Sequence, residues 1–349
     1  MKAVQFGDHG DRSVIEYGDF PDASPDRDEV LVDVKAGALN HLDVWTRKGM
    51  PGLDLDMPHV PGSDAAGTVV EVGEDVTRFE PGDRVAVSAG VYCGECEFCR
   101  HGEYSMCVNY HIIGEHVRGV HSERAAVPED NLVAVPMGVD WETAAAAPLV
   151  FQTAWRMLLT RGELEAGESV LVLGASGGVG HAAVQIADYA GSEVYATASS
   201  EEKLDYAEAV GADHVIDYEA EDFAARIREL TDNRGVDVVV DHVGEATYPD
   251  SLKSLAKGGR VVTCGATTGP NPGAGLNRIF WNQLSVIGST MATPGEVDDV
   301  LELVWDGTFE PRIREVLPMS ETARAHELLE AREGFGKVVV VPDSEYESR

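Results

Sequence analysis

The sequence predicts an α/β protein of two domains, one built on a doubly wound parallel sheet and the other rich in β-strands. Its 349 residues exceed the roughly 100–200 residues of a typical domain. Residues 169–264 alternate short runs of β-forming residues with helix-length amphipathic segments, the pattern of βαβ units. Residues 1–135 instead hold valine runs separated by Gly, Pro and Asp, which is typical of strands and tight turns.

The parallel sheet is expected to contain five strands joined by four helices. Right-handed crossovers between parallel strands favour a doubly wound arrangement. The strand candidates are residues 169–173, 193–197, 214–216, 236–241 and 260–264, and the helix candidates between them are residues 179–189, 201–210, 222–230 and 247–256.

The β-rich domain is expected to contain strands at residues 29–34, 67–72 and 83–87. Residues 295–341 hold two helix candidates and a final strand over Lys337–Val341, which is too little for a separate domain. We therefore expect the tail to rejoin the first domain. This gives one domain of residues 1–150 with 295–349, and a second of residues 151–294.

The charge of the chain is strongly negative. Lys and Arg total 27 against 61 Asp and Glu, a net charge of −34, which would repel nucleic acid and anionic lipid. Only seven of the basic residues are lysines. This composition favours adaptation to high salt, because at ~1 M salt the Debye length falls to ~3 Å and screens the self-repulsion. The alternative is an ordinary acidic surface.

The sequence contains no membrane or export signal that we recognise. No apolar run approaches the ~20 residues needed to cross a bilayer, and residues 1–10 lack the apolar stretch of a signal peptide. Hydrophobic residues at 44% are enough for ordinary globular cores. We expect a cytoplasmic protein with neither a membrane nor a nucleic-acid partner.

A glycine-rich loop follows the first strand of the parallel sheet. Small residues there let backbone amides at a helix N-terminus approach a pyrophosphate. Such a loop is weak evidence alone but strong at the start of several βα repeats. We expect cofactor contacts from this loop and from the end of the fifth strand, at Gly174, Ser176, Gly177, Gly178, Val179, Gly180 and Gly265.

The end of the second strand decides between NAD and NADP, since an acidic residue there would bind the ribose hydroxyls of NAD. The strand end is uncharged, and Ser199, Ser200 and Lys203 have the chemistry to hold a 2′-phosphate. This favours NADPH. Alternatively the two serines cap a helix, and Glu201 and Glu202 would repel a phosphate if they faced it.

Four of the five cysteines form the pattern Cys93-x2-Cys96-x2-Cys99-x7-Cys107. This spacing lets four thiolates converge on one tetrahedral ion, whereas disulfides are improbable in a reducing cytoplasm. We expect one structural zinc ion per chain. Because sulfur fills all four positions, such an ion has no place for a substrate.

Over nearly its whole length the chain resembles the medium-chain dehydrogenase/reductase superfamily. The resemblance implies a GroES-like catalytic domain completed by the carboxy-terminal tail, a Rossmann domain, and an active site between them. The motifs that carry it occur in the family's order: residues 1–4, residues 62–69, the turn at residues 81–85, the four-cysteine lobe and the loop at residues 174–180.

Zinc alcohol dehydrogenases of this family hold a catalytic zinc ion through three side chains. At the corresponding positions this sequence has Asn40, the pair Ser63-Asp64 and Leu149, which are poor ligands or none. The hydroxyl that relays the alcohol proton would fall at Leu42. The resemblance therefore implies no catalytic zinc at the usual place.

The replacing residues resemble the quinone oxidoreductase branch, although many of its members lack the four-cysteine lobe. Its Asn-x-x-Asp-x-x-x-Arg-x-Gly segment is matched by Asn40, Asp43, Arg47 and Gly49. In that branch a Lys, a Tyr and a carboxy-terminal Arg bind the 2′-phosphate of NADPH, and Lys203, Tyr218 and Arg332 fit the pattern. The resemblance also implies roles for His41 on the pyrophosphate, Thr153 near the nicotinamide and Trp45 along the substrate cleft.

The leading hypothesis is hydride transfer from NADPH to a quinone or an α,β-unsaturated carbonyl compound. Asn40 would donate a hydrogen bond to the developing oxyanion, and Asp43 is expected to orient backbone rather than act as an acid. The aromatic candidates for an apolar cleft are Trp45, Trp141, Phe151, Phe280 and Trp281.

Two alternatives remain open. One is a zinc alcohol or sugar dehydrogenase with a rearranged ligand set, drawn from His41, His59, Asp64, Glu115, His116 and His121. The other is a non-enzymatic NADPH-binding protein of the crystallin kind. The resemblance further implies a homodimer or homotetramer, assembled through an edge strand near residues 284–289.

Overall fold

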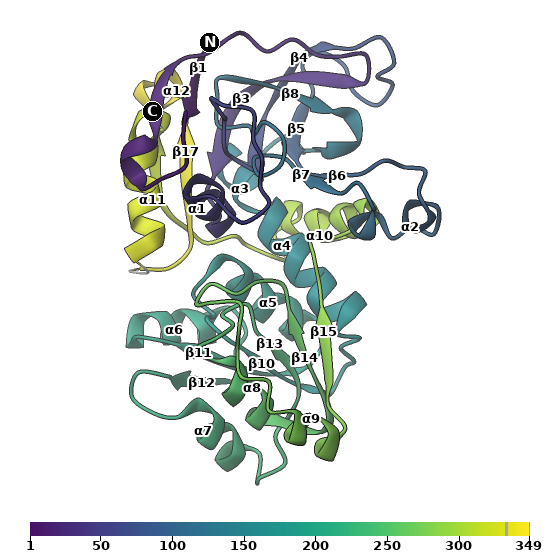
Figure 1. The fold of residues 1–349 in the computed structure, drawn as a ribbon, viewed down its shortest axis with the longest axis vertical. Coiled ribbons are helices and arrows are strands. Elements are labelled where there is room, and N and C mark those ends of the chain that lie inside the picture. Colours follow the sequence, from purple (N-terminus) through teal and green to yellow (C-terminus); the bar gives the residue numbers. More distant parts are fainter. Residues whose placement is uncertain (332–333, 349) are drawn as a thin grey trace. The chain divides into compact units, whose positions relative to one another are not determined.

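The computed structural model describes residues 1–331 and 334–348. The chain divides into two compact units (Figure 1): Met1–Leu149 with Thr293–Arg349, and Val150–Ala292. The tail thus joins the amino-terminal unit. No helix among the described residues combines the length and apolar character that a membrane crossing requires.

The first unit is built on a seven-stranded sheet, in the order β16-β17-β3-β4-β5-β9 with β8 also paired to β3. The carboxy-terminal strand β17 lies inside this sheet, antiparallel to β3 and parallel to β16. The strands are β1 (Lys2–Gln5), β2 (Glu16–Asp19), β3 (Glu29–Ala38), β4 (Asp64–Val72), β5 (Arg84–Val87), β6 (Gly90–Val91), β7 (His111–Ile112), β8 (Arg124–Pro128), β9 (Leu132–Ala134), β16 (Ile313–Pro318) and β17 (Lys337–Val341).

Short helices pack around this sheet. Helix α3 covers β3, β4 and β17 with the buried alanines Ala144, Ala145 and Ala146. Helix α10 begins at a capping box, in which the Thr293 hydroxyl accepts from the Glu296 amide, an arrangement that satisfies exposed helix-end donors. The helices are α1 (His41–Lys48), α2 (Glu97–Arg100), α3 (Trp141–Ala146), α10 (Pro294–Trp305), α11 (Thr322–Ala331) and α12 (Asp343–Glu347), and α4 (Pro148–Trp155) runs across the boundary between the units.

The second unit is a six-stranded parallel sheet in the order β12-β11-β10-β13-β14-β15. Numbered within the unit this is 3-2-1-4-5-6, the order of dinucleotide-binding sheets. The strands are β10 (Ser169–Val172), β11 (Glu193–Ala198), β12 (His214–Asp217), β13 (Val236–Val240), β14 (Leu255–Thr263) and β15 (Ser285–Gly288), and the helices are α5 (Gly178–Tyr189), α6 (Glu201–Ala209), α7 (Phe223–Leu230), α8 (Tyr248–Ser254) and α9 (Leu276–Asn282).

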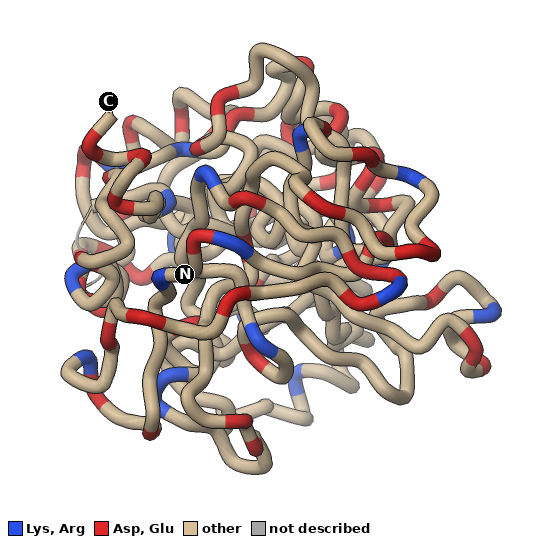
Figure 2. Tube along the Cα trace, turned by 90° about the horizontal axis from the view of Figure 1, so that it is seen from above, with Lys and Arg blue, Asp and Glu red and all other residues tan. Residues whose placement is uncertain are grey.

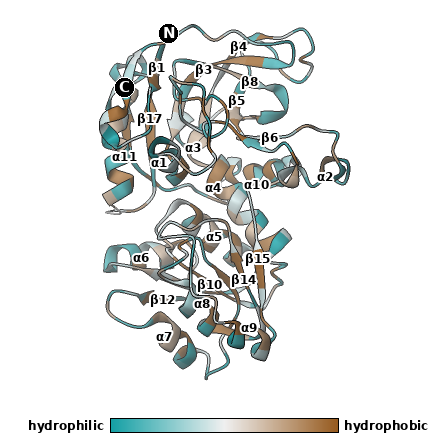
Figure 3. Cartoon of the chain, in the orientation of Figure 1, coloured by the Kyte–Doolittle hydropathy of each residue, from teal (hydrophilic) through white to brown (hydrophobic). Residues whose placement is uncertain are grey.

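The core of the second unit lies on both faces of this sheet. Val170, Leu171 and Val172 of β10 are fully buried, as expected for a parallel strand covered by helices on each side. The strands carry mostly apolar residues, and polar residues are concentrated on the helices and loops (Figure 3). A π-helix over Arg156–Arg161 is an element that the sequence analysis did not anticipate.

Candidate functional site

The glycine-rich loop lies between β10 and α5, as the sequence indicated. Gly174 has a φ of +60°, and a Cβ on Gly180 would overlap the carbonyl oxygen of Gly174. Gly177 is the N-cap of α5, while Gly178, Val179 and Gly180 form its first turn, and Ser176 lies in the turn before it. The loop therefore presents backbone amides at a helix N-terminus, a geometry suited to a pyrophosphate.

The residues expected at the 2′ position lie at the ends of the adjacent strands β11 and β12. Lys203 Nζ donates to Ser199 Oγ at 3.0 Å, and Ser200 is the N-cap of α6. Tyr218 follows β12 with its side chain 44% exposed, and its amide donates to the Ala198 carbonyl. Ser199, Lys203 and Tyr218 therefore have the chemistry for a phosphate. Arg332 lies outside the described residues.

A histidine that the sequence analysis missed lies beside the same loop. A Cβ on Gly174 would be 3.6 Å from the His242 ring, and one on Gly177 would be 3.8 Å from its Nε2. Burial lowers the pKa of His242, so the ring is neutral at pH 7. His242 follows β13, which pairs with β10, and this position at a carboxyl strand end was the available signal.

Two further expected cofactor-side residues belong to the second unit. Thr153 is buried in α4, and its hydroxyl lies 4.0 Å from the Met291 sulfur. Gly265 follows β14, and its carbonyl accepts from the Thr263 hydroxyl at 3.1 Å.

In the first unit, Asn40, Asp64 and Lys337 form a buried polar cluster. Lys337 Nζ donates to Asn40 Oδ1 at 2.6 Å and to Asp64 Oδ2 at 3.2 Å. Asn40 Nδ2 donates to the same Asp64 oxygen at 2.8 Å, and the Leu149 amide donates to Asp64 Oδ1 at 3.0 Å. Lys337 was not among the site residues expected from the sequence, although a lysine at the start of an otherwise all-valine strand was the available signal.

Asp43 lies next to this cluster and binds backbone. One carboxylate oxygen accepts from the Asn40 amide at 2.7 Å and the other from the Gly62 amide at 3.1 Å. Burial raises the pKa of Asp43 to about 7, against the opposing effect of these hydrogen bonds. The geometry agrees with an orienting role for Asp43.

The positions that correspond to zinc ligands do not suit a catalytic zinc ion. The Asn40 amide is held between Lys337 and Asp64, the Ser63 hydroxyl donates to the Ile113 carbonyl at 2.6 Å, and Leu149 has no donor atom on its side chain. A metal ion at Asp64 would also face the Lys337 ammonium. The side chains at these positions therefore do not fit a catalytic zinc ion.

The residues considered for a rearranged zinc site do not form one ligand set among the described residues, although His116 Nδ1 lies 3.7 Å from Glu115 Oε2. His59 Nε2 lies 3.1 Å from the Gly114 carbonyl, and His116 Nδ1 accepts from the Ile112 amide at 3.2 Å. His121 is buried, and His41 begins α1 with its ring 6.3 Å from that of Trp45. Among the described residues, only the four cysteines bring together three or more such side chains as one possible ligand set.

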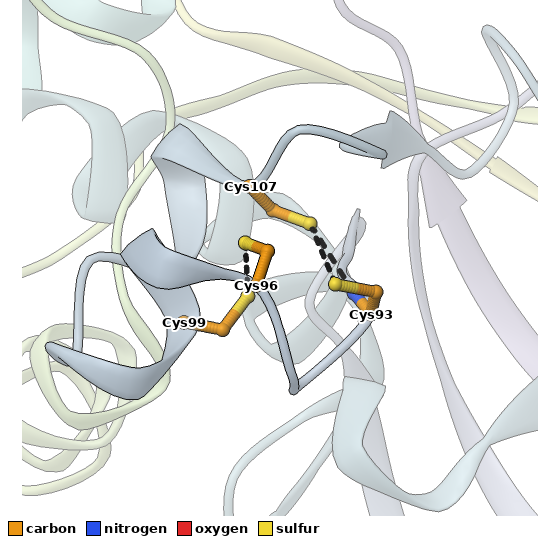
Figure 4. Close-up of side chains that lie close together, drawn as sticks. All are labelled: Cys93, Cys96, Cys99 and Cys107. Atoms are coloured by element: carbon orange, nitrogen blue, oxygen red, sulfur yellow. Dashed lines mark hydrogen bonds between the residues drawn. The ribbon is translucent and has the colours of Figure 1, made fainter.

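The sulfurs of Cys93, Cys96, Cys99 and Cys107 point toward one another from the lobe around α2 (Figure 4), all within 4.8 Å. The Cys96–Cys99 and Cys93–Cys107 sulfurs are 3.5 Å apart, close to the ~3.8 Å separation implied by Zn–S bonds of ~2.3 Å in a tetrahedron. Backbone amides of Cys99 and Val108 lower the pKa of Cys96 to about 6. The lobe thus fits a four-thiolate zinc ion.

The aromatic residues expected along an apolar cleft have different surroundings. Trp141 packs against the core of the first unit with the Arg84 guanidinium 3.5 Å from its ring centroid. Phe280 and Trp281 lie on α9 and are 65% and 77% exposed. Apolar character alone does not distinguish a cleft from a core or an exposed surface, so the cleft stays a prediction.

Comparison with known proteins agrees with this architecture. The family described as "Alcohol dehydrogenase GroES-like domain" matches residues 26–137, and "Zinc-binding dehydrogenase" matches residues 178–306. A quinone oxidoreductase of Pseudomonas aeruginosa is 35% identical over 98% of this chain and 99% of its own. An acryloyl-coenzyme A reductase of Sulfurisphaera tokodaii is 33% identical over 98% of this chain and 100% of its own.

A solved structure is also similar over almost the full length. The crystal structure of a protein described as an NAD-dependent alcohol dehydrogenase shares 43% identity, with a TM-score of 0.94, over 98% of this chain and 99% of its own.

Proposed function

The chain belongs to the medium-chain dehydrogenase/reductase superfamily and is an NAD(P)H-dependent oxidoreductase, and we propose that it transfers a hydride from NADPH to a quinone or an α,β-unsaturated carbonyl compound without a catalytic zinc ion. The observation that carries this proposal is the Asn40–Asp64–Lys337 cluster.

The chemistry of that cluster favours an acceptor that is already reactive. Oxidation of an unactivated alcohol near pH 7 requires stabilisation of an alkoxide, which zinc supplies as a Lewis acid. Here the ligand positions hold an amide, a hydroxyl and an alkyl group beside an ammonium. Reduction of a quinone or enone requires less stabilisation of charge, because positioning and exclusion of water already favour it.

The proposed step balances as a two-electron reduction. Bound NADPH supplies the hydride, which adds to the electrophilic carbon of the acceptor. An electron pair moves onto the acceptor oxygen, where an N–H of Asn40 donates to the developing negative charge. Water then supplies the proton that completes the reduction.

The relatives support this class of acceptor. One is named for a quinone and another for acryloyl-coenzyme A, and both acceptors carry activated double bonds. A small enoyl thioester is therefore the acceptor that we would assay first, followed by simple quinones.

The choice of NADPH over NADH is also a proposal. The absence of an acidic side chain at residues 198–200 and the contact between Lys203 and Ser199 support a 2′-phosphate site. The similar structure named for NAD is the reason to measure both cofactors.

The decisive experiment compares the two reaction classes under one set of conditions. Stopped-flow oxidation of NADPH by enones, an enoyl thioester and quinones is compared with reduction of NADP by primary and secondary alcohols. We expect the activated acceptors to turn over at least ten times faster. Faster turnover of the alcohols would reject the proposal.

The second candidate is a zinc alcohol dehydrogenase with a rearranged metal site, which the similar structure named as an alcohol dehydrogenase favours. Metal analysis separates the two candidates. One zinc ion per chain agrees with the reductase, and two agree with the dehydrogenase.

Self-association through the outer edge of the second unit is a further proposal. Strand β15 ends the parallel sheet. Its Val286 is exposed, as are Leu276, Phe280 and Trp281 of α9. Residues 251–295 contain neither Asp nor Glu, although the chain has 61 of them. A second copy of this chain fits this edge best, because pairing two strongly negative molecules requires a face without negative charge.

The acidic composition supports a salt-rich working environment. Asp and Glu greatly outnumber Lys and Arg along the chain (Figure 2). Molar salt would screen the repulsion among these carboxylates, and a salt-dependent fold and assembly are the expected consequences.

A further inference from the structure

The register of the first sheet brings three strand ends together. Lys337 begins β17 and Asp64 begins β4, while Asn40 lies two residues after the end of β3. Ala38 of β3 pairs with Val339 on one side and with Asp64 on the other. The Leu39 amide donates to the Val338 carbonyl at 2.9 Å, which holds the segment before Asn40 against β17.

The hydrogen bonds fix which way the Asn40 carboxamide faces. An ammonium is only a donor and a carboxylate is only an acceptor. Lys337 Nζ at 2.6 Å from Oδ1 and Asp64 Oδ2 at 2.8 Å from Nδ2 therefore require the same orientation of the amide. Rotating it by 180° would place like atoms against each other on both sides.

One amide proton of Asn40 remains for another acceptor. Nδ2 carries two protons, and within the described part of the chain Asp64 is the acceptor recorded for one of them. Asn40 as a whole is 7% exposed. Because Oδ1 accepts from a cation, the amide is polarised and its N–H groups become stronger donors.

On the basis of the function proposed above, we propose that Lys337 is the positioning residue of this reductase: its ammonium fixes and polarises the Asn40 carboxamide, which presents its second N–H to the substrate oxygen. Lys337 acts through Asn40 and does not itself contact the reacting atoms. Positive charge thereby supports the oxyanion by way of a hydrogen-bonded amide.

Asp64 keeps the ammonium in place. Lys337 is 3% exposed and Asp64 is fully buried, so each charge requires the other as a partner. The Leu149 amide satisfies the second Asp64 oxygen. The pair is thus balanced in charge, and the carboxylate orients both the ammonium and the amide.

The test is a double-mutant cycle between Lys337 and Asn40. Lys337→Met should lower kcat for reduction of the best enone or quinone by about 10- to 100-fold, with the NADPH Kd changed less than twofold. The same substitution in an Asn40→Ala background should cost less than threefold. An equal loss in both backgrounds would overturn the proposal. Lys257→Met removes an exposed lysine and is the matched control.

A variant that lacks both buried charges distinguishes a positioning role of Lys337 from a purely structural one. The double variant Lys337→Met with Asp64→Asn removes both members of the ion pair together, so neither is left without its partner, and it is expected to keep most of the thermal stability of the protein. It should remain about 10- to 100-fold slower, because the amide is no longer polarised. Wild-type kcat in this variant would show that Lys337 serves only the fold. Lys337→Arg keeps the charge and should recover part of kcat.

Nuclear magnetic resonance of the Asn40 side-chain amide provides a readout that does not depend on activity. Asn40→Ala identifies the resonance pair. In the wild type both protons should be resolved and exchange slowly with solvent, and Lys337→Met should shift them and speed exchange at least tenfold. Unchanged resonances would overturn the positioning role. If the wild type reduces neither enones nor quinones, the proposed function fails, while this spectrum still decides whether Lys337 fixes Asn40.

Discussion

Gly180 lies so close to Gly174 that a single methyl group on Gly180 would overlap the Gly174 carbonyl oxygen. The contact holds the first turn of α5 against the end of β10. It thereby fixes the position of the backbone amides at the start of α5 that would face a pyrophosphate.

Gly180→Ala is therefore expected to displace the loop. The overlap involves backbone rather than a flexible side chain, so we expect a loss of stability of about 1–3 kcal/mol and at least a tenfold weaker Kd for NADPH. Calorimetric titration and thermal unfolding measure the two effects. Gly273→Ala is the matched control, since a Cβ there meets no atom within 4 Å. Equal effects of the two substitutions would contradict the expectation.

Lys203 is the residue expected to distinguish NADPH from NADH. Its ammonium donates to Ser199 Oγ at 3.0 Å, beside the place proposed for the 2′-phosphate. A hydrogen bond to a charged group contributes about 1.5–3 kcal/mol, so Lys203→Ala should weaken NADPH binding at least tenfold and leave NADH binding unchanged. Fluorescence titration with both cofactors is the measurement. Equal weakening of NADPH and NADH binding would show that Lys203 does not contact the 2′-phosphate.

The four-cysteine lobe is expected to require its metal ion. Zinc content should be about one per chain, and removal by a chelator should lower Tm, because the lobe around α2 has little other core. Cys99→Ser should reduce both zinc content and Tm. Cys264→Ala changes the remaining cysteine, which lies outside the cluster, and should retain the metal. A second zinc ion that survives Cys99→Ser would favour the rearranged catalytic site.

Glu115 should make stability depend on pH. Burial, with a smaller contribution from the Asp43 charge, raises the pKa of Glu115 from 4.5 to about 7. Since the folded pKa is the higher one, the stabilising contribution is fully present below pH ~4.5 and is lost as the pH rises to ~7, by at most about 3 kcal/mol. Denaturant unfolding of wild type and Glu115→Gln should show this difference between pH 4.5 and 7. A constant difference would contradict it.

Salt should control both folding and assembly. In 2 M KCl we expect a dimer or tetramer, and below 0.1 M KCl a lower Tm together with dissociation, because the Debye length grows from less than ~3 Å to ~10 Å or more. Trp281→Glu puts a negative charge on the proposed interface and should give monomers in high salt. Light scattering measures the mass, with Tyr189→Glu at another exposed aromatic residue as control. Equal stability with and without molar KCl would reject the halophilic assignment.

The local sequence was sufficient to predict many strands of the parallel sheet. The strands expected at 169–173 and 193–197 correspond to β10 (Ser169–Val172) and β11 (Glu193–Ala198), because apolar runs between turn residues report burial directly. Strand β14 begins at Leu255, five residues earlier than expected, and includes residues 255 and 256, which were expected to end a helix. There the pairing with β13 outweighs local preference.

The candidate site was less accessible to sequence reasoning. Asn40 and Asp43 were found through a short motif, but Lys337 lies almost 300 residues further along the chain and meets Asn40 only through the pairing of β17 with β3. His242 was missed because one histidine after a strand has no spacing pattern of its own. Contacts made by the fold, rather than by neighbouring residues, carry this part of the chemistry.

The insertion of β17 between β16 and β3 also constrains how the protein is made. On the ribosome, the second unit can fold as soon as residue 292 has emerged, whereas the amino-terminal sheet must wait for the last strand to be synthesised. Until then the part of β3 that β17 pairs, at Gly37 and Ala38, is unpaired and exposed to other nascent chains. Premature termination before residue 337 should therefore yield insoluble polypeptide with an intact nucleotide-binding half.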